Sequence, residues 1–425
     1  MDYVSVLLPI ALILLICKSL AIICRRFGLP QVVGYLVGGI LLGLVKMIPN
    51  LGDYIFSSQG LEGLGFLAKV GVVLIMFSAG LETDLSKVKS TGVKSLLITS
   101  AGVIVPMGLG FLVTMFFLDG GYSNIAGNYK EALAYGCILT ATSVSVTVAT
   151  LKELGKLDTE MGTCIVSAAI LDDIIGVVVL SLVLGLNGVN GEDSAALVKS
   201  FNNCNINPAV SSVLGIVLFF LVFIPFGIIL SRLFQKLSKR YEHHRRIPVF
   251  ALAICFTYAW IAEEIFGVAD ITGAFLAGIL LSNNVDRNYI DRRTDIFTGF
   301  FFGPIFFANI GITMNFTNID GSFILLGVLF VIVGILGKLL GCGLVSKACG
   351  FNLKDSISIG VGMMVRAEVA LVCCDKLKSV VNPNITTFVV LLILITSLVA
   401  PVLLKLLNKP KNIDSNLDVK TTSNQ

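Results

Sequence analysis

Two adjacent aspartates, Asp172 and Asp173, lie in the middle of an apolar run from Ile165 to Leu186. The run is long and apolar enough to cross a lipid bilayer. A carboxylate at the depth of the bilayer costs roughly 2.5–3.5 kcal/mol, and two neighbouring negative charges also repel each other. A chain that keeps such a pair needs a counter-charge or a cationic ligand for it. The aspartate pair therefore predicts a functional site whose partner lies elsewhere in the sequence.

The composition predicts an all-α integral membrane protein. Hydrophobic residues make up 56% of the 425 residues and charged residues only 14%, far from the averages of soluble proteins. The first apolar span lacks a basic leader and a small-residue cleavage site, so we expect it to be retained. Residues 408–425 are predicted to form a short polar cytoplasmic tail. The thirteen predicted spans cover residues 3–24, 30–47, 64–81, 94–118, 131–151, 161–186, 209–233, 247–265, 268–282, 295–314, 320–345, 355–376 and 385–407.

The basic residues predict the orientation of the chain. The loops after odd-numbered spans, with the C-terminal segment, hold 22 of the 31 basic residues, and the loops after even-numbered spans hold five. Basic loops stay on the cytoplasmic side, so the N-terminus is predicted outside the cell membrane and the C-terminus inside. Because the basic residues follow the topology, the net charge of +4 gives no reason to expect nucleic acid as a partner. His243 and His244 are expected at the lipid headgroups, with pH sensing as the less favoured alternative.

The order of the spans predicts an inverted repeat. Thirteen spans divide as six, one and six, and counterparts in the two halves are seven crossings apart, so they run in opposite directions, as in many secondary transporters. The fifth span contains the hydroxyl-rich stretch 140–147, and its counterpart, the twelfth, contains the glycine-rich stretch 360–368. Hydroxyl side chains compete for backbone hydrogen bonds and glycine weakens a helix interior. Both spans are predicted to be broken, crossing helices at a midplane site, with small-residue packing faces as the alternative.

Each broken helix leaves partial charges at its new ends. Arg366 and Glu368 lie close to the second predicted break and are expected to compensate those charges. Because they are two residues apart, they cannot face each other on one helix. Each is therefore expected to have a different partner.

Lys338 is the predicted counter-charge, because it lies deep in the eleventh span with apolar residues on both sides. A lysine snorkelling to the membrane surface is the alternative. Adjacent helical residues point about 100° apart, so Lys338 is expected to take one aspartate and leave the other facing a cavity. That second carboxylate would hold a proton or a small cation, but not both, which is the minimal mechanism of cation–proton exchange. Since a buried lysine can also lose its proton, the exchange is expected to be electrogenic.

Several motifs occur together: Leu29–Gly43, Gly71–Glu82, Thr140–Ser143, Leu171–Asp173, Gly273–Gly278, Lys338 and Arg366–Glu368. With this set the chain resembles the bacterial monovalent cation:proton antiporters, of the NapA type and the Kef-like branch, over nearly all its length. The nucleotide-binding domain that Kef-type systems carry after the membrane part is not found in this sequence. That departure lowers the expectation of glutathione-gated potassium efflux without excluding potassium as a substrate.

The resemblance implies roles for particular residues and spans. Asp173 is implied as the main Na⁺ ligand and Asp172 as the partner of Lys338, and we expect Thr142 and Ser143 to contribute to the ion site. The resemblance also implies a homodimer of a transporter unit covering residues 1–407. In each protomer, spans 4–6 and 11–13 would form a core that moves against a dimerisation part made largely of spans 1–3 and 7–10.

The leading hypothesis is exchange of Na⁺ or Li⁺ for H⁺ across the membrane by alternating access. K⁺/H⁺ antiport is the alternative in the same class, and sodium-coupled symport of an organic anion is less favoured because midplane cationic residues are scarce beyond Lys338 and Arg366. A channel or a membrane scaffold fits the buried charges less well. The sequence shows no nucleophile–base arrangement and no metal-ligand cluster, so neither an enzyme nor a cofactor is expected.

Overall fold

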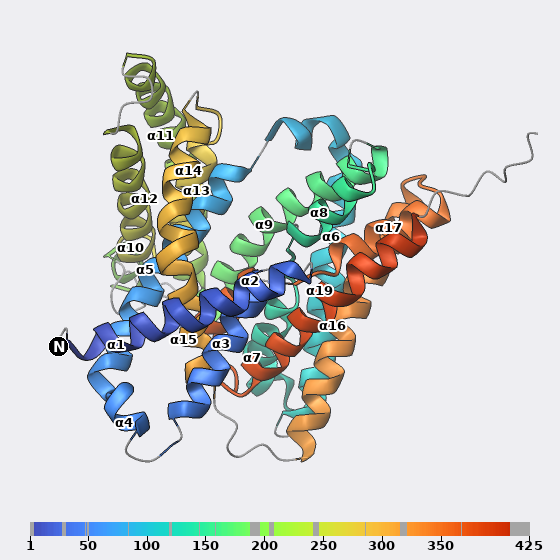
Figure 1. The fold of residues 1–425 in the computed structure, drawn as a ribbon. Coiled ribbons are helices and arrows are strands. Elements are labelled where there is room, and N and C mark those ends of the chain that lie inside the picture. Colours follow the sequence, from blue (N-terminus) through green and yellow to red (C-terminus); the bar gives the residue numbers. More distant parts are fainter. Residues whose placement is uncertain are drawn as a thin grey trace, which may run out of the picture.

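The computed structural model describes residues 4–27, 31–46, 48, 51–83, 85–118, 121–143, 145–157, 159–187, 196–203, 208–240, 246–284, 286–314, 321–366 and 368–408. Every regular element in these ranges is a helix (Figure 1), which confirms the predicted all-α class. Helices satisfy their backbone hydrogen bonds internally, as an apolar bilayer requires. In chain order the helices are α1 (Val4–Leu12), η1 (Ile13–Cys17), α2 (Lys18–Arg26), α3 (Gln31–Lys46), α4 (Leu51–Ile55), α5 (Ser58–Glu82), α6 (Leu85–Phe117), η2 (Gly121–Asn124), α7 (Ile125–Ile138), α8 (Ser145–Glu153), α9 (Glu160–Leu186), α10 (Ala196–Asn203), α11 (Pro208–Arg240), α12 (Arg246–Glu264), α13 (Asp270–Leu281), α14 (Arg287–Phe297), η3 (Thr298–Phe302), α15 (Gly303–Thr313), α16 (Gly321–Ala348), α17 (Leu353–Met363), α18 (Glu368–Lys376) and α19 (Ile385–Leu407).

Length and hydropathy identify nine helices in the described part of the chain that could cross a membrane. Two shorter apolar helices, α3 and α13, fall where the second and ninth spans are predicted. The predicted fifth and twelfth spans are interrupted, as α7 with α8 and α17 with α18. The chain is therefore a multi-pass membrane protein, and the total of thirteen spans stays a prediction.

Three local features differ from the predicted spans. The helix α10 follows the sixth span, where no element is predicted, and its Leu197 amide donates to the Ile265 carbonyl at 3.0 Å. The helix α6 is kinked at Gly92, whose φ of 51° favours glycine because it lacks a β-carbon. Short π-helical segments, η1 and η3, interrupt the first and tenth spans. The predicted spans include none of these features.

The helices pack mainly in two groups, which are seen on opposite sides of Figure 1. The α6/α16 group contains α6–α9 and α16–α19, and the α5/α13 group contains α1–α5 and α11–α15. The groups meet where α9 contacts α11 and α13, and where α19 contacts α3. Asp172, Asp173, Lys338 and Arg366 all belong to helices or breaks of the α6/α16 group.

Small residues allow the closest helix approach within the α5/α13 group. A β-carbon on Gly80 of α5 would lie 2.2 Å from the Phe275 carbonyl oxygen, and one on Gly278 of α13 would lie 2.3 Å from the Phe77 carbonyl oxygen. Such distances are too short for any other residue, so these two glycines set how closely α5 and α13 pack.

Candidate functional site

The two interrupted helices cross and hydrogen-bond to each other. The helix α7 ends at Ile138 and α8 begins at Ser145, while α17 ends at Met363 and α18 begins at Glu368. The Ser143 amide donates to the Val365 carbonyl at 2.8 Å, and the Thr147 hydroxyl donates to the Gly362 carbonyl at 2.7 Å. The predicted pair of broken, crossing helices is confirmed.

Hydroxyl groups stabilise the first break. The Thr140 hydroxyl donates to the Cys137 carbonyl of α7 at 2.8 Å, and the Thr142 hydroxyl donates to the Met363 carbonyl at the second break at 3.4 Å. These bonds take up carbonyls that a helix end leaves without intrahelical partners. The dense run of Thr and Ser therefore supplies local partners in place of a continuous helix, as the sequence indicates.

The Arg366 side chain carries a positive charge to the C-terminal end of α7. It is fully buried and donates to the carbonyls of Leu139 at 2.7 Å, of Ala141, and of Gly334 on α16 at 3.1 Å. A helix C-terminus bears a partial negative charge, and the guanidinium has five N–H donors in a planar fork. The structure thus identifies the partner expected for Arg366 as the unwound end of the other broken helix.

Glu368 is the first residue of α18, and its side chain lies outside the described residues. A carboxylate in the first turn of a helix is stabilised by the partial positive charge there. Its position in the chain therefore fits charge compensation at the second break, and that role stays a prediction.

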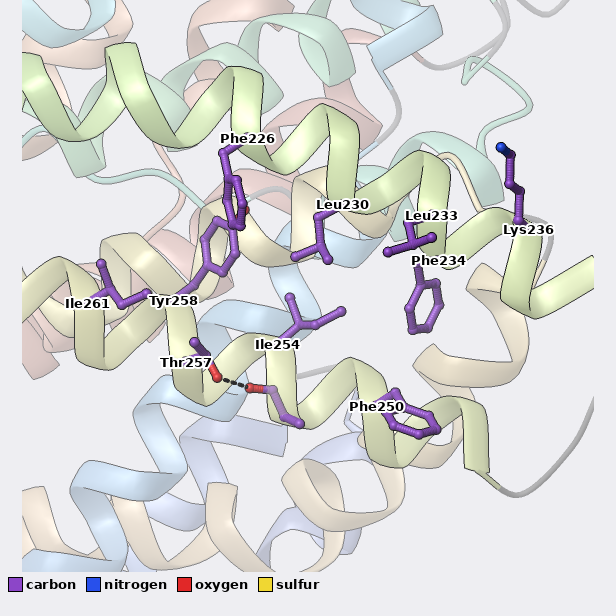
Figure 2. A pocket seen from close by; sticks show the side chains of 11 residues that line it. Phe226, Leu230, Leu233, Phe234, Lys236, Phe250, Ile254, Thr257, Tyr258 and Ile261 are labelled. Atoms are coloured by element: carbon purple, nitrogen blue, oxygen red, sulfur yellow. Dashed lines mark hydrogen bonds between the residues drawn. The ribbon is translucent and has the colours of Figure 1, made fainter.

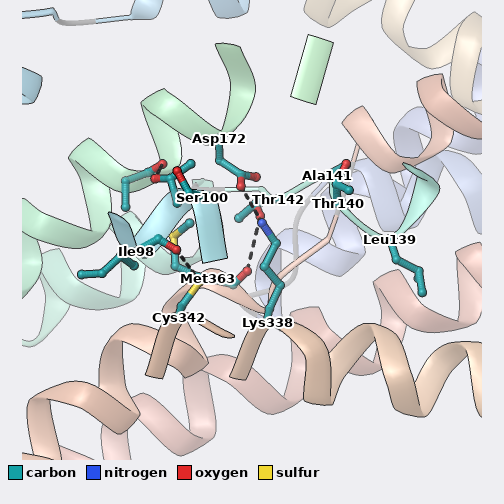
Figure 3. A network of polar contacts seen from close by, with 12 residues as sticks. Ile98, Ser100, Leu139, Thr140, Ala141, Thr142, Asp172, Lys338, Cys342 and Met363 are labelled. Atoms are coloured by element: carbon teal, nitrogen blue, oxygen red, sulfur yellow. Dashed lines mark hydrogen bonds and ion pairs between the residues drawn. The ribbon is translucent and has the colours of Figure 1, made fainter. Parts of the chain in front are cut away.

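Lys338 on α16 and Asp172 on α9 form a buried ion pair of 2.6 Å, with side-chain exposures of 0% and 1% (Figure 3). Both helices pack against α6. A β-carbon on Gly102 of α6 would lie 2.6 Å from Cys342 Sγ and 3.5 Å from Lys338 Nζ, so this glycine makes room for the lysine. This is the pairing that the resemblance implies, and it explains how two opposite charges remain inside an apolar bundle.

Asp173 follows on α9 and is half-buried, in contrast to its buried neighbour Asp172. Adjacent helical positions point about 100° apart, so the two aspartates leave α9 in different directions. Thr142 and Ser143 are buried in the break between α7 and α8. Figure 3 shows Thr142 beside the Asp172–Lys338 pair. The structure thus brings Asp172, Lys338 and Thr142 together, and the role of Asp173 as an ion ligand stays a prediction.

Some contacts at the site were not expected from the sequence. The Arg366 backbone amide donates to the Thr396 hydroxyl of α19 at 3.1 Å, which fixes the second break to a helix 30 residues further along the chain. Thr147 belongs to the hydroxyl-rich stretch, but the sequence does not show that it reaches Gly362. No periodic pattern relates these residues, because the partners are far apart in sequence.

Two charged residues outside the site have polar partners within the protein. Lys18 of α2 donates to the Gly299 carbonyl at 3.0 Å and to the Tyr35 hydroxyl at 3.2 Å, so the η3 segment is one of its partners. Asp270 of α13 forms an ion pair with Lys376 of α18. Both contacts depend on tertiary packing.

A large apolar cavity lies away from these charges, between α11 and α12 of the α5/α13 group. It has a volume of about 720 Å³, and its lining residues include Phe226, Leu230, Phe250 and Tyr258 (Figure 2). None of its described lining residues is a carboxylate. Thr257 and Tyr258 supply the only hydroxyls among its described lining residues, so the cavity offers a hard cation few oxygen ligands and is a poor candidate for the ion site.

Comparison with known proteins identifies relatives over nearly the whole chain. The family model described as sodium/hydrogen exchanger, transmembrane, matches residues 11–409. The probable Na⁺/H⁺ antiporter GerT of Bacillus cereus is 33% identical over 85% of this chain and 88% of its own length. The Na⁺/H⁺-K⁺ antiporter GerN of Bacillus cereus is 32% identical over 93% of this chain and 94% of its own length. The solved structure of the sodium proton antiporter MjNhaP1 from Methanocaldococcus jannaschii, 15% identical, superimposes with a TM-score of 0.71 over 96% of this chain and 99% of that one, which shows the shared fold.

Proposed function

Because this chain belongs to the sodium/hydrogen exchanger family, we propose that it exchanges Na⁺ or Li⁺ for H⁺ across the membrane by alternating access. The observation that carries the proposal is the buried Asp172–Lys338 pair beside two crossing, broken helices. Broken helices near the bilayer midplane are where secondary transporters bind their ions. The antiporter names of GerT and GerN support the same reaction.

In this mechanism the Asp173 carboxylate holds either a proton or the cation. Protonation removes the charge that attracts the cation, and cation binding displaces the proton, so the two compete for one group. The hydroxyls of Thr142 and Ser143 and the carbonyls of the broken helices supply further oxygen ligands. Lys338 provides a second proton if cation binding separates it from Asp172, and the exchange is then electrogenic.

Potassium is the second candidate cation. GerN, a relative of 32% identity, is named as a Na⁺/H⁺-K⁺ antiporter. The same oxygen ligands would bind either alkali cation, and selectivity between them depends on ligand number and cavity size. Sodium-coupled symport of an organic anion is less favoured, because the buried cations Lys338 and Arg366 already have partners inside the protein.

We further propose how the transporter is placed and assembled. The proposed orientation has the N-terminus outside the cell membrane and the C-terminus in the cytoplasm, and the positive-inside rule supports it. Two protomers would associate through the α5/α13 group, and the α6/α16 group would move against it in each. The exposed apolar side chains of α12, with Trp260 at 61% and Val249 at 65%, supply a face for lipid or for the second protomer. The protein is proposed to act as a transporter without enzymatic activity and to need no cofactor.

Antiport assays on reconstituted proteoliposomes test the function and its site. Each of Na⁺, Li⁺ and K⁺ is added against a preset pH gradient, and the cation that dissipates the gradient is identified as the substrate. The Asp173→Asn variant is expected to lose this exchange because it keeps the shape of the side chain without its charge. Glu160→Gln on the same helix, an exposed position, is the matched control. Full exchange by Asp173→Asn would overturn the site assignment.

A further inference from the structure

Two polar contacts connect the α6/α16 group to the first turn of α13, in the other group. The Lys376 ammonium of α18 forms an ion pair with the Asp270 carboxylate. The Ser181 hydroxyl of α9 and the Thr272 hydroxyl of α13 lie 3.0 Å apart and form a buried hydrogen bond. The start of α13 is therefore attached to two different helices of the group that contains the ion site.

Both contacts lie on one side of the ion site. Ser181 is eight residues after Asp173 on α9, which is about 12 Å along a helix axis. Asp270 is the first residue of α13 and follows the C-terminal end of α12, which has the basic residue Arg246 at its N-terminal end. The basic N-terminal end of α12 belongs to the cytoplasmic side in the proposed orientation. Its C-terminal end, and with it the two contacts of α13, therefore lies toward the outside.

The geometry of the ion pair suits a contact that forms and breaks. The side chains of Asp270 and Lys376 are 18% and 22% exposed, so the pair is partly screened but still reached by water. Asp270 is also held by the amide of Ile271, which donates to its carboxylate at 2.8 Å. Water can solvate both charges when the pair separates, which makes separation far less costly than breaking the fully buried Asp172–Lys338 pair.

The two helix groups leave a cavity between them near the C-terminal end of α18. A cavity of about 190 Å³ lies between the end of α15, in the α5/α13 group, and α18 with the start of α19. Polar side chains line part of it, among them Asn309, Thr313 and Asp375. A movement of α18 away from α15 would widen this existing cavity and would not have to separate a close-packed interface there.

We propose that Asp270 and Lys376, supported by Ser181 and Thr272, form an outer latch that holds the ion site closed to the outside. The latch releases when the α6/α16 group moves and the site opens outward. This inference rests on the proposed alternating-access function. It predicts that neutralising either charge shifts the population toward the outward-open state, because only the closed state contains the pair.

Hydrogen–deuterium exchange on the purified full-length protein tests the latch without any transport. Asp270→Asn and Lys376→Gln are each expected to raise amide exchange at the start of α13 and the end of α18 by about fivefold, the effect of a modest ion pair. The double variant is expected to match the single variants, because the second substitution removes nothing further. Additive effects, or exchange equal to that of the wild type, would overturn the latch.

Transport kinetics provide a second readout. Each single variant is expected to lower the KM for external cation relative to the KM for internal cation, whereas mere loss of stability would change both sides alike. Lys94→Gln is the matched control, since it breaks the Lys94–Glu160 ion pair of 2.7 Å within the α6/α16 group and leaves the ratio unchanged. If the wild type shows no cation exchange, the proposed function fails, and the deuterium exchange still decides whether the latch exists.

Discussion

The guanidinium of Arg366 donates to the carbonyl of Leu139 at 2.7 Å, so the second broken helix supplies a positive charge to the C-terminal end of the first. The first break therefore depends on the second: the unwound backbone after α7 accepts hydrogen bonds from the Arg366 side chain of the second break. Backbone groups left without partners at this depth would each cost several kcal/mol. Arg366 is accordingly both a structural requirement and a fixed charge close to the ion site.

Arg366→Lys is expected to destabilise the protein even though it keeps the charge. A lysine ammonium cannot reach several carbonyls at once with the planar fork that arginine offers. Loss of hydrogen bonds to a charged group costs about 1.5–3 kcal/mol each, so a clear fall in the melting temperature is expected in detergent. Arg232→Lys, at an exposed position of α11, is the control, and equal melting temperatures for the two variants would contradict this role of Arg366.

The buried ion pair predicts strong coupling between Asp172 and Lys338. Replacing either residue by its neutral analogue, Asp172→Asn or Lys338→Gln, leaves one charge buried without its partner, which costs about 3–5 kcal/mol. The double variant is expected to be less destabilised than the sum of the two, because it leaves no unpaired charge. Equilibrium unfolding of the four proteins in detergent measures the coupling, and strict additivity would argue against a direct interaction.

Lys338→Arg tests whether the lysine carries a proton during transport. The guanidinium keeps the positive charge beside Asp172 but effectively cannot release a proton. The variant is therefore expected to exchange one cation for one proton without moving net charge. Membrane currents from reconstituted protein measure this directly. Transport that remains fully electrogenic in Lys338→Arg would remove the lysine from the proton-coupled role.

Gly102→Ala is expected to disturb the site by steric contact alone. Its new methyl group would lie 2.6 Å from Cys342 Sγ, and the Lys338 ammonium is 3.5 Å away. Overpacking of this kind costs about 1–3 kcal/mol, and adding Cys342→Ala should relieve most of it. Gly65→Ala on α5, where no atom lies within 4 Å of the new methyl group, should be neutral or stabilising. Thermal unfolding of the single and double variants checks both expectations.

Much of the fold could be predicted from the sequence because a bilayer leaves a chain few choices. Apolar runs must become helices, and the apolar segment around Asp172 and Asp173 singles out a site, since charge is costly at that depth. The hydroxyl-rich and glycine-rich stretches marked both breaks, and the apolar residues on both sides of Lys338 favoured its pairing with an aspartate of α9. These inferences depend on solvation energy and local backbone chemistry, which a single segment carries by itself.

Other features were decided only by the tertiary structure. The sequence left the partner of Arg366 open, and nothing in it related Lys376 to Asp270, 106 residues away. A hydrogen bond or ion pair between distant segments depends on the crossing angle of the helices and on the position of each residue along its helix axis. Hydrophobic periodicity specifies neither the crossing angle nor the relative position of two residues along their helices. The aspartate pair was therefore readable as a site from the chain alone, whereas the network that holds it together is a property of the packed helices.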